Sequence, residues 1–390
     1  MKKSIIILGS TGSIGKSTIE IIKKNKKNFN IRLLSTNKNV SELIKQAKEF
    51  KVKNLIINDY NQFIKAKKKF KKFNFNIHNS FSIIDKLFKK KEIFYSMISI
   101  VGLDGLNPSL QMIKYSKNIA IVNKESLVCG WTLVKKKLNY FKTNFIPIDS
   151  EHFSIFSLLK NHNVNSVEKL YITASGGPFL KYPNSKLKKI TLNSALKHPN
   201  WVMGKKISID SSTMMNKVFE VIEARNIFDI EYKKIFILTH PKSYIHAIIR
   251  FNNGLIKMLI HEADMKIPIH NSIFNNQSQF LRSKKMDLDI LNNLELKKIN
   301  SKQFPLIKVL NRLPKFNSLY ETAIITINDF FVNCFLRKEL NYRKMIKLIY
   351  KFCNDKEILK FKRIPVKNIE QIHKLRNYLS LKLENFVYKI

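Results

Sequence analysis

The sequence has few cysteines, few acidic residues and no long hydrophobic run, and each scarcity excludes a class of protein. The three cysteines, Cys129, Cys334 and Cys353, form no CxxC pair and no metal-binding spacing, so we expect buried thiols rather than disulfides. No apolar run approaches the roughly eighteen residues that a membrane-spanning helix needs, so we expect no membrane partner. Acids are outnumbered, 28 Asp and Glu against 71 Lys and Arg, which makes any group of carboxylates informative.

The chain is long and apolar enough for an enzyme-sized globular protein. Its 390 residues suggest two or three domains, and a hydrophobic content of 44% is sufficient for their cores. Met1-Lys2-Lys3 leads directly into a strand-like run without an apolar secretion segment. We therefore expect a cytoplasmic protein.

A formal net charge of +43 ordinarily suggests a partner such as nucleic acid. Here the positive charge is mostly Lys, and it is spread through the whole chain beside abundant Ile, Asn and Phe, as an AT-rich genome encodes any protein. The densest runs, residues 65–72 and 89–91, are typical of solvated helix faces. We expect no nucleic-acid partner, although the surplus charge favours anionic ligands.

The first motif with a physical mechanism is the glycine-rich turn Gly9–Gly15. It follows a strand-like run, Ser4–Leu8, and precedes a helix-compatible run, Lys16–Lys24. Glycines at such a turn let the backbone approach a pyrophosphate, which binds at the positive end of the helix. The spacing is GxxGxxG rather than GxGxxG, but strand, turn and helix occur in the required order. The segment predicts a dinucleotide-binding fold, and the alternative is a glycine-rich turn without a ligand.

The end of the second expected strand, Ile31–Leu34, discriminates between cofactors. NAD-binding domains place Asp or Glu there to hold the ribose 2′-hydroxyl. This sequence continues as Ser35-Thr36-Asn37-Lys38-Asn39, with no acid and with a lysine available for a 2′-phosphate. NADPH is therefore favoured over NADH.

The rest of the N-terminal half alternates strand-like and helix-like runs. The expected strands are residues 54–57, 96–101, 118–122 and 145–148. This alternation predicts a parallel sheet covered by helices, which binds ligands at the carboxyl ends of its strands. Asn123–Ser126 lies at such an end, where it could cap a helix or contact a substrate and the nicotinamide ribose.

Two carboxylates flank a hydroxyl in Asp149-Ser150-Glu151, directly after the last of these runs. Side chains of a strand alternate between its faces, so residues two apart point the same way and these acids could hold one cation. The alternative is a solvated turn or a helix cap.

Three further polar segments follow in the middle third of the chain. Ser175-Gly176-Gly177-Pro178 would expose amide and hydroxyl donors suited to a phosphate. His198–Gly204 has few cues for regular structure and could form a lid. Asp210–Glu220 is typical of a capped helix in which Asn216 and Glu220 lie one turn apart on one face. Taken singly, these segments could equally be a turn, an exposed loop and an amphipathic helix.

In this order, the motifs resemble those of the 1-deoxy-D-xylulose 5-phosphate reductoisomerase family of the non-mevalonate isoprenoid pathway. Residues beyond about 300 match weakly. The strings that carry the resemblance are Gly9–Gly15, Asn123–Ser126, Asp149–His152, Ser175–Phe179, His198–Gly204 and Asp210–Glu220.

The resemblance implies a metal-dependent rearrangement of 1-deoxy-D-xylulose 5-phosphate, followed by NADPH reduction to 2-C-methyl-D-erythritol 4-phosphate. It places the metal ligands on Asp149, Glu151 and Glu220. Three carboxylates suit Mg2+ or Mn2+, with Co2+ as a further candidate, and disfavour zinc.

The resemblance also implies the remaining site residues. The substrate phosphate would bind to Ser175, Ser211, Asn216 and Lys217, with His198 contributing from the lid. Lys124 and Ser150 would contact substrate oxygens, and Trp201 and Met203 would cover substrate and nicotinamide. The implied NADPH contacts are Thr11, Gly12, Ser13, Ile14, Asn37, Lys38, Asn39, Asn123, Glu125 and Gly204.

The expected fold is α/β in class. It comprises a Rossmann-like, doubly wound NADPH domain (residues 1–149), an α+β catalytic and dimerisation domain with the lid (150–275), a linker (276–302) and a C-terminal helical bundle (303–390). A hairpin is expected in the second domain, with Asn252-Asn253-Gly254 as its turn. The resemblance further implies a homodimer.

Three alternatives remain open from the sequence. Another NADP-dependent dehydrogenase, of the homoserine type for example, would share the nucleotide fold, but the acidic trio and the lid segment argue against it. A basic nucleic-acid-binding protein would need a recognition motif, and the sequence contains none. A decayed enzyme is disfavoured because the motif residues persist in a drifted composition.

Overall fold

The computed structural model describes residues 2–182, 190–201, 203–274 and 279–388. The chain forms two compact units. The first comprises residues 1–127, 133–153 and 265–283, and the second comprises residues 128–132, 154–264 and 284–390. The division falls inside two helices, α6 (Lys124–Phe141) and α7 (Ser150–Leu159), so each of these helices contributes to both units.

The first unit contains a parallel sheet of seven strands in the order β4-β3-β2-β1-β5-β6-β7. The order reverses between β1 and β5, which creates the switch point where doubly wound sheets bind ligands. The strands are β1 (Lys3–Leu8), β2 (Phe29–Thr36), β3 (Asn54–Ile57), β4 (Asn76–His78), β5 (Ile93–Ile98), β6 (Ser116–Ile121) and β7 (Asn144–Phe145).

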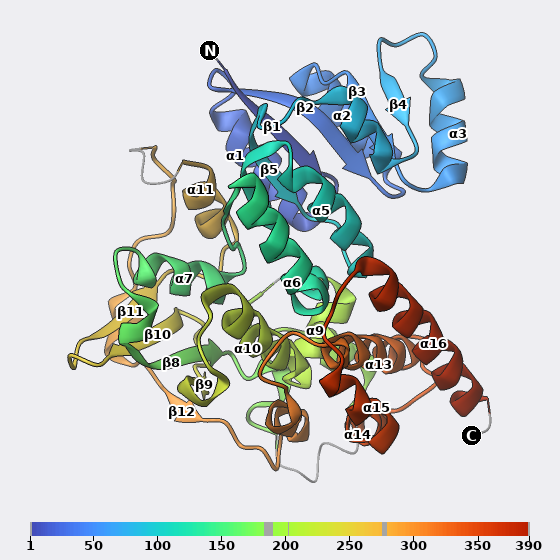
Figure 1. Ribbon diagram of the computed structural model, residues 1–390. Helices are drawn as coiled ribbons and strands as arrows, with labels where there is room; N and C mark the ends of the chain where they lie inside the picture. The colour runs from blue at the N-terminus through green and yellow to red at the C-terminus, as the bar shows by residue number, and fades with distance from the viewer. Residues whose placement is uncertain (1, 183–189, 202, 275–278, 389–390) are drawn as a thin grey trace. The chain divides into compact units, whose positions relative to one another are not determined.

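Helices connect these strands, as parallel pairing requires. Figure 1 shows β4 and α3 at the outer edge of this unit. Apart from α6, the connecting helices are α1 (Ser13–Lys24), α2 (Val40–Phe50), α3 (Tyr60–Lys69), α4 (Ile84–Leu87) and α5 (Leu106–Ile113). The helix α11 (Lys266–Phe274) comes from later in the chain and contacts α1.

The second unit contains a mixed sheet of five strands in the order β11-β10-β8-β9-β12. The strands β8 and β9 are parallel, the other pairs of this sheet among the described residues are antiparallel, and β10 and β11 form the expected hairpin. The strands are β8 (Val167–Ala174), β9 (Ile235–Thr239), β10 (Ile245–Phe251), β11 (Ile256–Ile260) and β12 (Lys297–Lys298).

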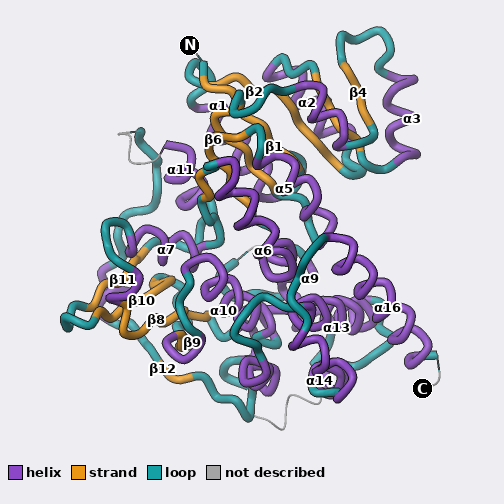
Figure 2. Tube along the Cα trace, viewed as in Figure 1, coloured by secondary structure: helices purple, strands orange, loops and turns teal. Residues whose placement is uncertain are grey.

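The helices of the second unit comprise four that precede residue 300 and a C-terminal bundle among the described residues. The four are α8 (Leu192–Leu196), α9 (Lys205–Ser212), α10 (Met215–Phe228), which contacts β9, and α12 (Leu288–Asn292). The bundle comprises α13 (Leu319–Leu336), α14 (Tyr342–Cys353), α15 (Lys356–Lys360) and α16 (Ile369–Val387), and Figure 2 shows it as helices and loops. No helix among the described residues is long and apolar enough to span a membrane.

The predicted fold class is confirmed: a Rossmann-like parallel sheet is followed by a mixed-sheet α+β part and C-terminal helices. The exact domain limits stay a prediction, and the boundary at residues 275 and 276 lies outside the described residues.

Three local predictions were wrong. The strand expected at 145–148 is only Asn144–Phe145, because Pro147 has no N–H with which to extend the pairing. The strand expected at 96–101 spans Ile93–Ile98. The single helix expected over 210–220 is two helices, α9 and α10, which meet at Met214, whose backbone is left-handed.

Candidate active site

The turn after β1 leaves the N-terminal end of α1 open to a ligand. Gly9 has a φ of +82°, and a Cβ there would lie 2.6 Å from the Ser99 carbonyl oxygen at the end of β5. A Cβ on Gly15 would lie 2.4 Å from the Gly9 carbonyl oxygen, so both positions require glycine. Gly12 is exposed and precedes the first turn of α1, which carries no acid. The Gly12 amide donates to the Gly9 carbonyl at 3.1 Å and closes the turn, so it is the positive end of the helix dipole of α1 that suits a pyrophosphate.

The turn after β2 lies beside this glycine turn. The Gly9 amide donates to Ser35 Oγ at 2.8 Å, and the hydroxyls of Thr11 and Thr36 are 2.7 Å apart. Beyond Thr36, the three residues Asn37–Asn39 are exposed, and the Asn39 side chain caps α2. This places the exposed Lys38 near the end of β2, where a cofactor's ribose phosphate would lie.

The start of α6 brings a buried lysine to the carboxyl end of β6. Asn123 caps the helix by accepting from the Ser126 amide at 2.6 Å, and its side-chain amide donates to the carbonyls of Ile100 and Gly102. Lys124 and Glu125 are buried in the first turn. Lys124 Nζ lies 3.6 Å from Asp149 Oδ2, so the lysine faces one of the predicted metal ligands.

The helix α7 carries the first two acids of the predicted trio. Asp149 precedes the helix and Glu151 is in its first turn, so the chain's entry into a helix, rather than strand alternation, brings the two carboxylates together. Ser150 Oγ donates to Glu151 Oε2 at 2.6 Å. The later turn of α7 packs in one core with α10, through Ile155 and Val221 for example.

This packing joins Glu220 of α10 to the other two acids. One oxygen from each of Asp149, Glu151 and Glu220 lies within 4.8 Å of the others. Glu220 is buried, accepts from the Asn216 side chain and forms an ion pair with Lys217. Lys217 was expected at the phosphate, and its ammonium here faces a carboxylate because both buried charges need an opposite partner.

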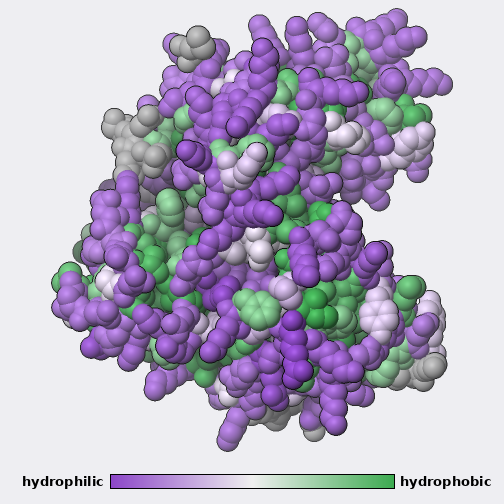
Figure 3. Space-filling view, in the orientation of Figure 1, coloured by the Kyte–Doolittle hydropathy of each residue, from purple (hydrophilic) through white to green (hydrophobic). Residues whose placement is uncertain are grey.

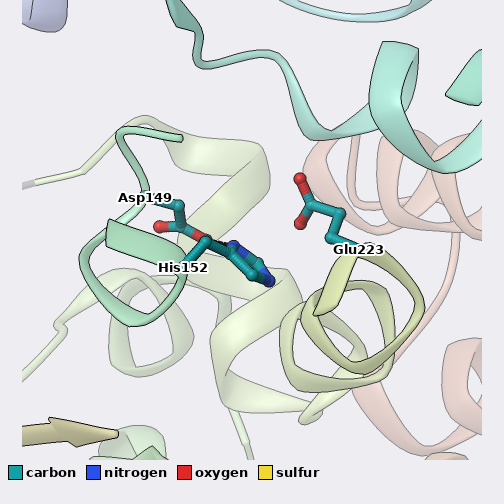
Figure 4. Close-up of side chains that lie close together, drawn as sticks. All are labelled: Asp149, His152 and Glu223. Carbon is teal, nitrogen blue, oxygen red and sulfur yellow. Dashed lines mark ion pairs between the residues drawn. The ribbon is translucent and has the colours of Figure 1, made fainter. Parts of the chain in front are cut away.

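A second group shares Asp149 and was missed by the sequence reasoning. Asp149, His152 and Glu223 each offer one atom within the same 4.8 Å limit, and Figure 4 shows their side chains facing one space. His152 Nδ1 lies 3.4 Å from Asp149 Oδ2. Glu223 is three residues after Glu220, so the helical repeat could have indicated it.

Two members of the predicted phosphate set, Ser175 and His198, lie within hydrogen-bonding distance of each other. Ser175 Oγ accepts from the Gly177 amide at 3.1 Å and lies 3.0 Å from His198 Nε2. Because His198 Nδ1 accepts from the amides of Asn200 and Trp201, its proton is on Nε2 and is donated to Ser175. The Ser175 hydroxyl proton can then be donated to an anion.

Gly177 brings this loop against the end of α9. Its φ is +64°, and a Cβ there would lie 3.0 Å from the Ser211 carbonyl oxygen and 3.1 Å from Ser212 Cα. The missing side chain therefore allows the Ser175 loop and Ser211 to approach each other. Both serines, with Asn216 and Lys217 at the start of α10, belong to the second unit.

The expected lid segment is held by its polar side chains. Asn200 Nδ2 donates to the Pro241 carbonyl and to Ser243 Oγ, both at 2.7 Å. The Trp201 ring contacts His246 edge-on, at 6.1 Å between centroids. Met203 is half-buried and Gly204 precedes α9, whereas Val202, between Trp201 and Met203, lies outside the described residues.

Protein-family profiles match most of the chain. The profile described as 1-deoxy-D-xylulose 5-phosphate reductoisomerase matches residues 5–130, and that of its C-terminal domain matches 145–228. A third profile, DXP reductoisomerase C-terminal domain, matches residues 260–379.

Sequence relatives and solved structures agree with these matches. The reductoisomerase of Pelagibacter ubique is 52% identical over 384 residues, covering 98% of this chain and 99% of its own length. That of Clostridium tetani is 36% identical, covering 89% and 91%. A Zymomonas mobilis reductoisomerase solved with NADPH has a TM-score of 0.88 at 27% identity and full coverage of both chains. A DOX-P reductoisomerase solved with NADPH, fosmidomycin and magnesium has a TM-score of 0.88 at 28% identity, covering 99% and 98%.

Proposed function

The chain belongs to the 1-deoxy-D-xylulose 5-phosphate reductoisomerase family, and from this membership we propose which of its residues carry the reaction. The enzyme converts 1-deoxy-D-xylulose 5-phosphate to 2-C-methyl-D-erythritol 4-phosphate with NADPH and a divalent cation. The main support for these residue roles is that the carboxylates of Asp149, Glu151 and Glu220 lie close together.

These three acids fit a hard divalent cation such as Mg2+ or Mn2+. They offer oxygen atoms close enough to share one ion, in a chain where acids are scarce. A bound cation supplies Lewis acidity toward substrate oxygens. The buried position of Glu220 keeps that ligand fixed, which favours a defined geometry over a mobile surface site.

The protein's own groups bind and orient the substrate. The hydroxyls of Ser175 and Ser211 and the side chains of Asn216 and Lys217 anchor the phosphate, a non-reacting group whose binding energy holds the reacting carbons in place. Lys124 and Ser150, beside Asp149 and Glu151, contact substrate oxygens, and Lys124 assists proton transfer.

The lid residues exclude water, and the nucleotide unit binds the reductant. His198 joins the lid segment to the phosphate set through Ser175, while Trp201 and Met203 cover the substrate. NADPH binds with its pyrophosphate at Thr11–Ile14 and its 2′-phosphate at Asn37–Asn39. Asn123, Glu125 and Gly204 complete the proposed cofactor contacts.

The proposal extends to assembly and location. The strand β11 is an edge of the five-stranded sheet and exposes apolar side chains, which suits pairing with a second copy of the chain into a homodimer. The three cysteines are free and buried, as expected of a protein that works in the reducing cytoplasm.

The test is the metal-dependent oxidation of NADPH by 1-deoxy-D-xylulose 5-phosphate in wild type and Glu151→Gln. The amide removes one charged ligand at nearly constant size, so we expect kcat to fall on the order of 100-fold or more and the Mg2+ requirement to rise. The control is Glu231→Gln, which changes an exposed glutamate outside the site. Unchanged metal dependence in a folded Glu151→Gln variant would show that the ligand assignment is wrong.

A further inference from the structure

The serine of the phosphate set on α9, Ser211, lies between two residues that are tied to the C-terminal bundle. On one side is Asp210, a buried residue whose Oδ1 accepts from Asn328 Nδ2 of α13 at 2.7 Å. Asn328 is itself buried, so this hydrogen bond forms away from solvent, where it is strong and costly to lose.

On the other side of Ser211, the bundle holds the end of α9 through Tyr342. Tyr342 Oη donates to the Ser212 carbonyl at 2.8 Å and lies 3.2 Å from Ser212 Oγ. The hydroxyl remains a donor at every working pH, because burial raises the pKa of Tyr342. This hydrogen bond satisfies the carbonyl of the last residue of α9, which has no backbone N–H partner within the helix.

The Tyr342 ring also reaches the second phosphate-binding segment. It packs edge-on against Phe179, at 5.3 Å between centroids, and Phe179 ends the short helix that follows Ser175-Gly176. One buried tyrosine of the bundle therefore contacts both segments that carry the phosphate-binding serines.

The first turn of α9 has a third contact with the bundle, through α13, the helix that also carries Asn328. Lys206 Nζ lies 2.8 Å from Asp329 Oδ1 of α13 and 3.2 Å from Asp210 Oδ2. The bundle thus contacts α9 at both of its ends, and two of these three contacts, those at Asp210 and Ser212, are adjacent to Ser211.

We propose that Tyr342 and Asn328 of the C-terminal bundle are positioning residues that fix Ser211, with Ser175, in the geometry that binds the substrate phosphate. This inference rests on the proposed function, because it assigns a role toward the phosphate of that substrate. It gives the bundle a part in the reaction, since a small displacement of an anchoring group impairs the alignment of the reacting atoms.

The chain offers a matched pair of tyrosines for the test. Tyr320 of α13 is also buried, and its Oη donates to the Cys353 carbonyl at 2.7 Å within the bundle. Tyr342→Phe and Tyr320→Phe therefore each remove one buried hydroxyl that donates to a backbone carbonyl, but only the first removes a tie to α9.

Each variant is compared with wild type by steady-state kinetics and by calorimetric binding of 1-deoxy-D-xylulose 5-phosphate, and urea unfolding reports its stability. We expect Tyr342→Phe to raise KM and Kd for the phosphosugar about 10-fold, with KM for NADPH unchanged and a smaller change in kcat. Tyr320→Phe is expected to keep the wild-type KM for both substrates. Asn328→Ala, which removes the tie to Asp210, should reproduce the KM effect of Tyr342→Phe.

Two results would overturn the inference while leaving the proposed function intact. One is wild-type KM in both Tyr342→Phe and Asn328→Ala despite lowered stability, which would make the bundle a purely structural support. The other is an equal rise of KM in both tyrosine variants, which would indicate general loosening. A folded wild-type protein that neither turns over nor binds the phosphosugar would refute the proposed function, and the inference with it.

Discussion

Glu321 is the residue whose ionisation has the clearest consequence for stability. It is buried in the first turn of α13, where its Oε2 accepts from the amide and the hydroxyl of Ser318, at 3.1 and 2.6 Å. Burial disfavours the charged carboxylate and raises the pKa of Glu321 to about 7, although the hydrogen bonds from Ser318 act in the opposite direction. The folded protein therefore keeps the Glu321 carboxyl protonated up to about pH 7, whereas the unfolded chain releases this proton near pH 4.5.

Because the folded-state pKa is the higher one, Glu321 contributes stability that is fully present below pH 4.5 and is lost as the pH rises through about 7. We expect the free energy of unfolding of wild type, relative to Glu321→Gln, to fall by about 2 to 3 kcal/mol between pH 5 and pH 8. Urea unfolding of both proteins at the two pH values measures this difference.

The control for this experiment is Glu370→Gln, which changes an exposed glutamate in the first turn of α16. In Glu370→Gln, the free energy of unfolding should change between pH 5 and pH 8 by as much as it does in wild type. If it also changes by that amount in Glu321→Gln, then Glu321 is ionised in the folded protein at both pH values and the raised pKa is wrong.

The sequence could identify single residues only where a motif or a local repeat links them. Asp149 and Glu151 are close in the chain and Glu220 falls in a recognisable string, so all three were predicted as metal ligands. Glu223 is separated from His152 by 71 positions, and only the packing of α7 on α10 brings them together. The ion pair of Lys217 with Glu220 was missed for a related reason, since the residue type alone does not say which anion an ammonium faces.

Among the elements, the turn between β1 and α1 allows two glycines to be compared. A Cβ on Gly15 would overlap backbone atoms of Gly9 and Ser10 at 2.4 and 2.5 Å, whereas a Cβ on Gly12 would meet only the Gly9 carbonyl oxygen at 3.5 Å. We expect Gly15→Ala to lower the free energy of unfolding by about 1 to 3 kcal/mol, because backbone cannot move aside as a side chain can.

Gly12→Ala should separate binding from stability. Its backbone, with φ −77° and ψ 175°, accepts alanine, so we expect a change within about 0.5 kcal/mol in urea unfolding. The methyl group would project where the pyrophosphate approaches α1, and the Kd for NADPH should rise about 10-fold in a fluorescence titration. A Gly12→Ala variant with wild-type affinity would place the cofactor elsewhere.

Element prediction from the sequence succeeded where periodicity decided the outcome and failed where one residue overrode it. The strand Asn54–Ile57 was predicted to the residue, because polar residues bound its apolar run. The run at 145–148 has the same apolar character, yet Pro147 ends the strand and the chain turns into α7. The left-handed Met214 that separates α9 from α10 has no cue in its residue type, since that conformation favours glycine or asparagine.

At the scale of the whole molecule, the charge of +43 is a property of composition rather than of one surface. The last turn of α3 contains Lys67, Lys68 and Lys69, whereas other lysines are paired with acids far from it, such as Lys266 with Glu20. On the face drawn in Figure 3, hydrophilic residues cover most of the surface and hydrophobic residues form smaller patches among them. The net positive charge attracts both an anionic phosphosugar and NADPH. It raises the rate at which they encounter the protein, but it does not determine where on the protein they bind.

The proposed homodimer predicts that charge placed on β11 separates the protomers. Leu255, Ile256 and Met258 are 53%, 60% and 44% exposed on or beside this edge strand, whose free side can pair with a second copy. Sedimentation should give wild type twice the 45.8 kDa mass of one chain and give Ile256→Lys the mass of one chain, because a lysine buried in the interface would lack an opposite charge. Leu381→Lys, at a residue 62% exposed on α16, controls for a general effect of added charge and should stay dimeric. A monomeric wild type would contradict the dimer, and a dimeric Ile256→Lys would place the interface on another surface.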